Sequence, residues 1–332
     1  MLCGFAVCML LAGVGCGSHS SDAASEDGTQ AQTEAPEGRY RIVATTAMVA
    51  DIVRHVVGDR ADVEGLMGTG VDPHLFRPST SDHAKMYSAD VIFYSGLMLE
   101  GGLDPVLKKA REQNKPAFAV TEGIDPSYLR YSEEFEGHPD PHVWNDVSAW
   151  SECVSYVAEK MSDFDPEHAD EYRTNAEQYR AQLAELHEYA RRVIASIPDG
   201  QRTLVTAHDA FEYFSRAYGI PVKSVLGITT ESEAGVEDIN SLVDFLVEQQ
   251  IPAVFVETSV NSRNIEAVIE GAAKRGWEVR IGGTLFSDAM GAPGTYEGTY
   301  IGMLDHNATV VARGLGGDAP ERGLQGMLSV RP

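Results

Sequence analysis

The sequence predicts an α/β fold, in which two parallel-sheet α/β domains are joined by one long rigid helix. Short apolar stretches alternate with helical stretches on both sides of residues 165–198. Residues 165–198 themselves carry one uninterrupted apolar stripe with helical spacing. A chain of 332 residues, 43% of them hydrophobic, is long enough for two domains, which we place at 39–164 and 199–332.

The first residues read as a targeting segment. Residues 1–16 are small and apolar up to Cys16, too short to span a membrane, and typical of a signal peptide. Cys16 follows Gly15, which resembles a bacterial lipoprotein cleavage site, so Cys16 is a possible lipid-carrying cysteine. Residues 17–38 contain no large apolar side chain and predict a flexible linker. We expect an exported protein, either periplasmic or lipid-anchored to the outer face of the cell membrane.

Charge and cysteine content exclude several classes of function. The net charge of −24, without a basic cluster, argues against nucleic acid and anionic membrane surfaces as partners. Three of the four cysteines lie in residues 1–16, which leaves Cys153 alone in the body of the chain. A disulfide framework and a cysteine metal site are therefore excluded there, and Cys153 is expected to be a small buried apolar residue.

The first domain is predicted from alternating strands and helices. The expected strands are residues 41–45, 63–67, 89–94 and 116–120, and the expected helices include 48–57 and 103–113. This alternation implies a parallel sheet covered on both faces, in which ligands bind at the carboxyl ends of the strands.

The long helix is predicted to begin at Asp165-Pro166-Glu167, with Asp165 as its N-cap, and to end before Pro198. Its length of roughly 48 Å exceeds what one small domain needs, so we interpret it as a strut between domains. The alternative is an antiparallel helical hairpin, which is disfavoured because no second long heptad stretch is evident. The apolar stripe has steps of three and four, at Ala169, Tyr172, Ala176, Tyr179, Leu183, Leu186, Ala190, Val193 and Ile197.

The same alternation resumes after the strut. The expected strands are 202–207, 222–226, 253–256 and 277–281. A helix is expected to open within 208–214, and further helices are expected at 239–249, 265–274 and 300–313. The sequence thus predicts a second α/β domain like the first.

Two loops of the first domain contain the sequence Asp-Pro-His, ending at His74 and His142. Proline fixes the backbone just before each imidazole, which helps to hold the ring. One copy alone would be read as a turn, but two copies in one domain favour a shared metal. His208 and Asp288 also follow predicted strands, although each could simply cap a helix or a turn.

Taken together, these loops resemble a known family. The chain is similar, over about residues 39–315, to the manganese/zinc solute-binding proteins of bacterial ABC transporters, the cluster A-I or TroA-like metal receptors. The resemblance rests on the order and spacing of Gly70-Val71-Asp72-Pro73-His74, Asp140-Pro141-His142-Val143-Trp144, Thr206-Ala207-His208-Asp209-Ala210-Phe211, Glu257-Thr258-Ser259-Val260-Asn261 and Phe286-Ser287-Asp288.

The resemblance implies two α/β domains joined by one rigid helix, with a metal ion in the cleft between them. It implies the metal ligands His74, His142, His208 and Asp288, two from each domain. Glu257 is the candidate for holding a ligand imidazole through its free N–H, and Asp72 and Asp209 are weaker candidates.

The implied function is capture of a divalent transition metal, manganese or zinc, and its delivery to an ABC permease in the membrane for import. The ion would be transported ligand rather than cofactor, and the protein a monomer. Four protein ligands leave no open coordination position, so the protein is not expected to be an enzyme. Because binding needs neutral imidazoles, affinity is expected to fall below about pH 6.5.

The choice of metal stays open at this point. His208 stands where manganese-selective members often have glutamate, and the long His-rich loop of zinc-uptake members is absent. The rival functions are a zinc-dependent hydrolase with Glu257 as base, although no HExxH pairing is present, and a surface adhesin lipoprotein. A receptor for a siderophore or vitamin is a third rival, which would need an aromatic or basic cleft.

Overall fold

The computed structural model describes residues 39–329, apart from 133, 134 and 136. These residues belong to one compact unit. The predicted signal peptide, Cys16 and the linker 17–38 lie outside the described residues. Within the described part of the chain, no helix is both long and apolar enough to cross a membrane.

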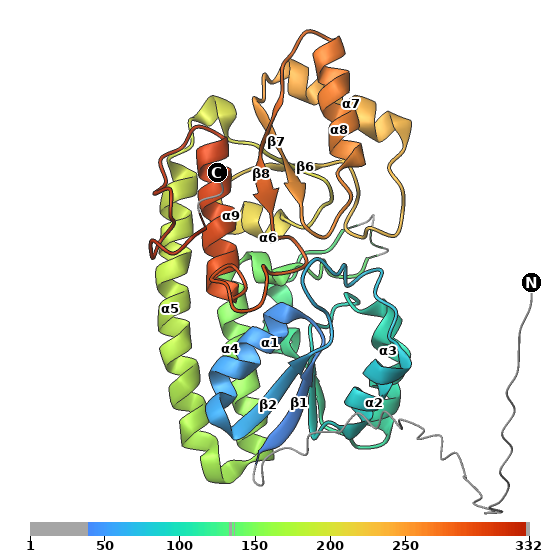
Figure 1. The fold of residues 1–332 in the computed structure, drawn as a ribbon, viewed down its shortest axis with the longest axis vertical. Helices are drawn as coiled ribbons and strands as arrows, with labels where there is room; N and C mark the ends of the chain where they lie inside the picture. The colour runs from blue at the N-terminus through green and yellow to red at the C-terminus, as the bar shows by residue number, and fades with distance from the viewer. Residues whose placement is uncertain (1–38, 133–134, 136, 330–332) are drawn as a thin grey trace, which may run out of the picture. The chain divides into compact units, whose positions relative to one another are not determined.

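The first lobe is built on a four-stranded parallel sheet (Figure 1). Its strands have the order β2-β1-β3-β4, with Ile42 of β1 opposite Val63 of β2 on one side and Val91 of β3 on the other. Each strand lies within two residues of its predicted position. The strands are β1 (Tyr40–Ala44), β2 (Ala61–Gly65), β3 (Val91–Tyr94) and β4 (Ala117–Ala119), and the helices between them are α1 (Ala47–Val57), α2 (Thr80–Ser88) and α3 (Asp104–Glu112).

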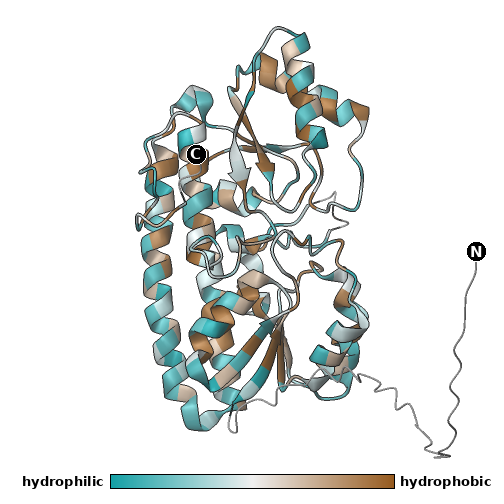
Figure 2. Ribbon diagram, in the orientation of Figure 1, coloured by the Kyte–Doolittle hydropathy of each residue, from teal (hydrophilic) through white to brown (hydrophobic). Residues whose placement is uncertain are grey.

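Helix α1 shows why these elements form where they do. The side chain of Thr46 caps its start by accepting from the Val49 N–H, and Gly58, at φ 53°, ends it. Its apolar face is buried, which makes the sheet and α1 one continuous hydrophobic region (Figure 2).

The second lobe contains two parallel strand pairs, β5–β6 and β7–β8, with β5 beside β7. The strand expected at 277–281 lies at Arg280–Leu285 instead. Trp277 precedes this strand and donates its indole N–H to the Ile251 carbonyl. The helix expected to open within 208–214 begins only at Glu212. The elements are β5 (Leu204–Thr206), α6 (Glu212–Tyr218), β6 (Val222–Ser224), α7 (Val236–Glu248), β7 (Ala253–Glu257), α8 (Arg263–Lys274), β8 (Arg280–Leu285) and α9 (Tyr300–Gly314).

The long helix α5 (Ala169–Ala195) joins the two lobes (Figure 1). Its 27 residues make it about 40 Å long. The predicted stripe is buried except at Ala169, which is half-buried. Its first half, up to Leu186, packs in the core of the first lobe, and its second half, from Tyr189, packs in a core of the second lobe. The predicted fold class, parallel-sheet α/β with one long connecting helix, is confirmed.

Two predictions about this region were wrong: that α5 lacks an antiparallel helical partner, and that Asp165 caps α5. Helix α4 (Val147–Phe164) pairs with the first half of α5, so a helical hairpin exists there after all. The two helices are antiparallel, because Arg180 binds Ser151 and Glu152 near one end while Ser162 lies against residue 169 at the other. Cys153 is fully buried in α4, as expected.

Asp165 does not cap α5 as predicted. Residues Pro166–His168 form a separate 3₁₀ turn, so α5 begins at Ala169. The Asp165 carboxylate instead accepts from the His168 ring at 2.8 Å and the Tyr172 hydroxyl at 2.7 Å, which secures the corner of the hairpin.

The lobes are interlocked around Trp144. The indole N–H of Trp144 donates to the Ser287 carbonyl at 2.8 Å, and the Tyr300 hydroxyl donates to the Trp144 carbonyl at 2.7 Å. Asn145 donates to the Ala210 carbonyl at 2.9 Å. The loop that carries His142 is therefore attached to the second lobe by hydrogen bonds between buried groups.

Candidate metal centre

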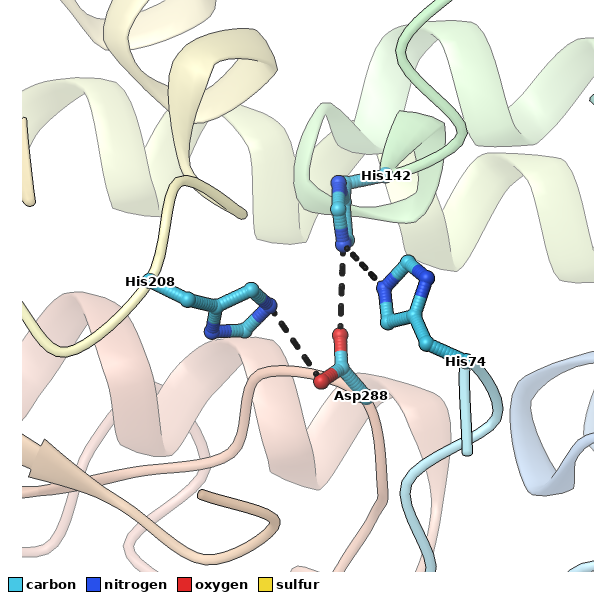
Figure 3. Close-up of side chains that lie close together, drawn as sticks. All are labelled: His74, His142, His208 and Asp288. Atoms are coloured by element: carbon cyan, nitrogen blue, oxygen red, sulfur yellow. Dashed lines mark hydrogen bonds and ion pairs between the residues drawn. The ribbon is translucent and has the colours of Figure 1, made fainter. Parts of the chain in front are cut away.

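Four side chains from four separate loops converge at the boundary between the lobes (Figure 3). His74 follows β2, His142 precedes α4, His208 follows β5 and Asp288 follows β8. All four side chains are buried, and one potential ligand atom from each lies within 4.8 Å of the others. The structure thus brings together all four residues that the family resemblance singled out.

His142 is held by a carboxylate in its own loop. Asp140 Oδ1 accepts from the His142 backbone N–H at 2.9 Å and from the ring Nδ1 at 2.7 Å. Because a carboxylate can only accept, Nδ1 carries a hydrogen and Nε2 is directed toward Asp288. Sequence reasoning missed this role of Asp140, although its place two residues before the histidine in the Asp-Pro-His motif was the available signal.

The first Asp-Pro-His copy works differently. Asp72 Oδ1 accepts from the His74 backbone N–H at 2.8 Å, while its Oδ2 accepts from the Thr230 hydroxyl in the other lobe. The carboxylate therefore holds the His74 loop rather than the ring. The His74 Nε2 lies 3.2 Å from the His142 Nε2, and burial lowers the pKa of His74 to about 3.

His208 is held by Glu257, the last residue of β7. Glu257 Oε2 lies 2.5 Å from the His208 Nδ1, and Oε1 accepts from the backbone N–H groups of Ala207 at 2.7 Å and His208 at 3.0 Å. This contact arises because β5 lies beside β7 and both strands end at the same edge. Glu257 thus contacts the ring of a proposed ligand, whereas Asp209, the weaker candidate for that role, lines a different hollow beside β6.

Asp288 lies between the two held rings. Its Oδ1 is 3.4 Å from the His142 Nε2, and its Oδ2 is 3.3 Å from the His208 Nε2. The His208 Nε2 and the Asp288 Oδ1 are buried and have no hydrogen-bond partner among the described residues. Burying a polar atom without a partner costs free energy unless a ligand binds it. Three imidazoles and one carboxylate are a donor set that suits a transition metal.

The charged side chains of the site shift one another's pKa values. Burial alone would lower the pKa of His142, but the carboxylates of Asp140 and Asp288 outweigh it and raise that pKa to about 9. Burial opposes the charge of His208 as well, yet Glu257 and Asp288 raise its pKa well above the ordinary value. Burial likewise opposes the charge of Asp288, and His208 and His142 nevertheless hold its pKa well below the usual range. The neighbouring carboxylates thus favour the charged form of both the His142 and the His208 imidazole when no metal is bound.

One side of the site adjoins a hollow that reaches the surface, lined by His74 together with Met98, Phe135 and Ile228. Among the described residues that line this hollow there is no lysine or arginine, and Phe135 is the one large aromatic side chain. A siderophore or vitamin receptor would need an aromatic or basic cleft, so this geometry favours a bare cation.

Comparison with known proteins identifies relatives of the chain. The family model described as zinc-uptake complex component A, periplasmic (ZnuA), matches residues 42–314. The manganese-binding lipoprotein MntA of Bacillus subtilis (strain 168) is 45% identical over 288 residues, which cover 87% of this chain and 94% of that protein. The zinc-binding protein TroA of Treponema pallidum (strain Nichols) is 43% identical over 279 residues, which cover 84% of this chain and 90% of that protein.

A solved structure agrees with these relatives. The periplasmic zinc-binding protein TroA from Treponema pallidum matches the fold with a TM-score of 0.81 at 42% identity, covering 84% of this chain and 99% of that chain. The likeness therefore includes both lobes and α5.

Proposed function

The chain belongs to the family of the periplasmic zinc-uptake component A, and from this membership we propose that it is the solute-binding protein of an ABC transporter for a divalent transition metal. It captures zinc or manganese outside the cytoplasm and delivers the ion to a membrane permease. Its relatives are named as binding proteins, and this chain is a binding protein rather than an enzyme. The relative MntA is named as a lipoprotein, which favours an exported protein anchored through Cys16.

The observation that carries the proposal is the buried cluster of His74, His142, His208 and Asp288. In this proposal the three histidines bind the ion through Nε2 and Asp288 binds it through its carboxylate. Glu257 and Asp140 hold two of the rings by their Nδ1 atoms.

The donor set favours zinc over manganese in affinity. Imidazole nitrogen suits zinc, whereas manganese is held best by oxygen ligands, and the general stability order places zinc above manganese. The relatives are named for both ions, and the ion carried in the cell depends on availability as well as on affinity. We therefore propose a site that holds either ion and holds zinc more tightly.

The domain division that we propose is 39–164, 165–198 and 199–332. Hydrogen bonds around the metal ligands cross the boundary between the two α/β domains. The Trp144 and Asn145 hydrogen bonds join His142 to the lobe that carries His208 and Asp288. The His74 loop is attached to the same lobe through Asp72, which accepts from the Thr230 hydroxyl. Because α5 packs in both cores, we propose that release uses loop movement or a small tilt of the lobes rather than a wide hinge opening.

A metal titration at several pH values tests this function. At neutral pH the metal-free site should hold protons on His142 and His208, while His74 is neutral. A divalent ion that displaces two protons leaves the charge of the site unchanged, and each displaced proton makes the apparent affinity rise roughly tenfold per pH unit. Zinc affinity is thus expected to fall about a hundredfold per unit from pH 8 to pH 6, with one ion bound per chain.

Metal affinity is therefore expected to begin falling at a higher pH than the sequence alone predicts. The sequence alone predicts a decline that begins near pH 6.5, whereas the carboxylates beside the two rings extend the dependence toward pH 9. Calorimetry in two buffers of different ionisation enthalpy counts the released protons directly. An affinity that stays constant from pH 8 to pH 6, or binding without proton release, would contradict the proposed ligand set.

A further inference from the structure

The β7–β8 pair places a pair of serines against Asp288. Glu257 pairs with Leu285 in the strand register, and the Thr258 N–H continues the ladder by donating to the Leu285 carbonyl at 3.0 Å. Two residues beyond the end of each strand, the hydroxyls of Ser259 and Ser287 lie 2.8 Å apart. Ser287 is fully buried and directly precedes Asp288.

The direction of these hydrogen bonds can be assigned. The Ser259 hydroxyl lies 3.1 Å from the Asp288 Oδ2, and a carboxylate oxygen can only accept. Ser259 therefore donates its hydrogen to Asp288 and accepts the hydrogen of Ser287. Ser287, Ser259 and Asp288 thus form a short chain of hydrogen bonds, a relay that ends on the Asp288 Oδ2.

The relay makes the two oxygens of Asp288 unequal. Oδ2 accepts from Ser259, whereas Oδ1 is buried without a hydrogen-bond partner among the described residues. A bound hydrogen occupies one lone pair and weakens Oδ2 as a metal donor, while Oδ1 keeps its full donor strength. Because each oxygen has more than one lone pair, this contact biases the binding mode of Asp288 and does not forbid the use of both oxygens.

We propose that Ser259 is a specificity-determining residue of the metal site, which favours coordination by one oxygen of Asp288 over coordination by two. This proposal rests on the proposed function. Three imidazoles and one carboxylate oxygen complete the four-ligand shell that zinc accepts. Manganese prefers a higher coordination number with more oxygen ligands, so the loss of the second oxygen disfavours it. In this account Ser259 increases the preference for zinc without touching the ion.

The test compares zinc and manganese dissociation constants for the whole chain and its variants at one pH. In Ser259→Ala the Oδ2 atom is freed, so manganese should gain relative to zinc, and the ratio of the manganese to the zinc dissociation constant should fall about tenfold. Ser259→Thr keeps the hydroxyl and should retain the parent ratio. Ser262→Ala is the matched control, because Ser262 lies in the same loop but donates to Glu266.

A second measurement reports the coordination directly. X-ray absorption of the zinc-loaded protein should give four ligands for the parent and five for Ser259→Ala. An unchanged ratio of dissociation constants, or an equal loss of affinity for both metals, would overturn the role of Ser259 in specificity. Failure of the parent chain to bind either metal would instead overturn the proposed function itself.

Discussion

Replacing Asp288 with asparagine is expected to weaken zinc binding by roughly 10²- to 10⁴-fold. Asp288 is the one anionic side chain among the four proposed ligands, and it is fully buried between the His142 and His208 rings. Removing one charge from a buried, paired arrangement costs about 3–5 kcal/mol, and each 1.4 kcal/mol corresponds to about tenfold in affinity. Asparagine has nearly the same shape, so the loss would report the charge rather than packing. Competition with a metal chelator measures it.

The matched control is Asp209→Asn, which makes the same chemical change next to His208. Burial raises the pKa of Asp209 to about 6, but this carboxylate lines a separate hollow. Zinc affinity in the control is expected to stay within a few-fold of the parent. A comparable loss in both variants would mean that general electrostatics, rather than ligation by Asp288, governs binding.

The variant Glu257→Gln is expected to weaken zinc binding by about 10- to 100-fold. Three donors converge on the Glu257 carboxylate: two backbone N–H groups and the His208 Nδ1. Glutamine has only one acceptor oxygen, so the two backbone groups and the ring can no longer all be satisfied. Its amide N–H₂ then faces Nδ1 and favours the other imidazole tautomer, which puts a hydrogen on the Nε2 atom that should bind the metal.

The control for this variant is Glu266→Gln, near the start of α8, where the exposed carboxylate accepts from the hydroxyl of the half-buried Ser262. The control should bind zinc as the parent does. Thermal melting of the metal-free proteins separates a loss of affinity from a loss of fold. An unchanged zinc affinity in Glu257→Gln would show that Glu257 does not hold a ligand ring.

The connecting helix and the sheet of the first lobe could be predicted because their signals are local. The stripe from Tyr172 to Ile197 repeats over many turns, and short strands bounded by helices have few other interpretations. Helix α4 also has a clear helical pattern, with Trp150, Val154, Val157 and Met161 buried on one face. The sequence analysis did not predict α4, although this pattern is a local signal of the same kind.

The four side chains that meet, and Glu257 beside His208, could be named from the sequence, whereas the contacts of Asp140 and Ser259 could not. The motifs around the proposed ligands pointed to a family, and the family implied which side chains meet. No local pattern could show that Ser259 and Ser287 meet over Asp288, because that depends on the register of β7 with β8. In the same way, the attachment of the His142 loop to the second lobe depends on hydrogen bonds that span 143 and 65 positions in sequence.

The central claim, that His74, His142, His208 and Asp288 together hold one metal ion for transport, has one most direct test. It is elemental analysis of the purified chain beside His208→Ala, before and after exposure to zinc and manganese. The account predicts close to one equivalent of zinc or manganese in the parent and a sharply reduced content in the variant. Absence of metal from both proteins, with none taken up when either ion is supplied, would contradict the metal site and the receptor function together.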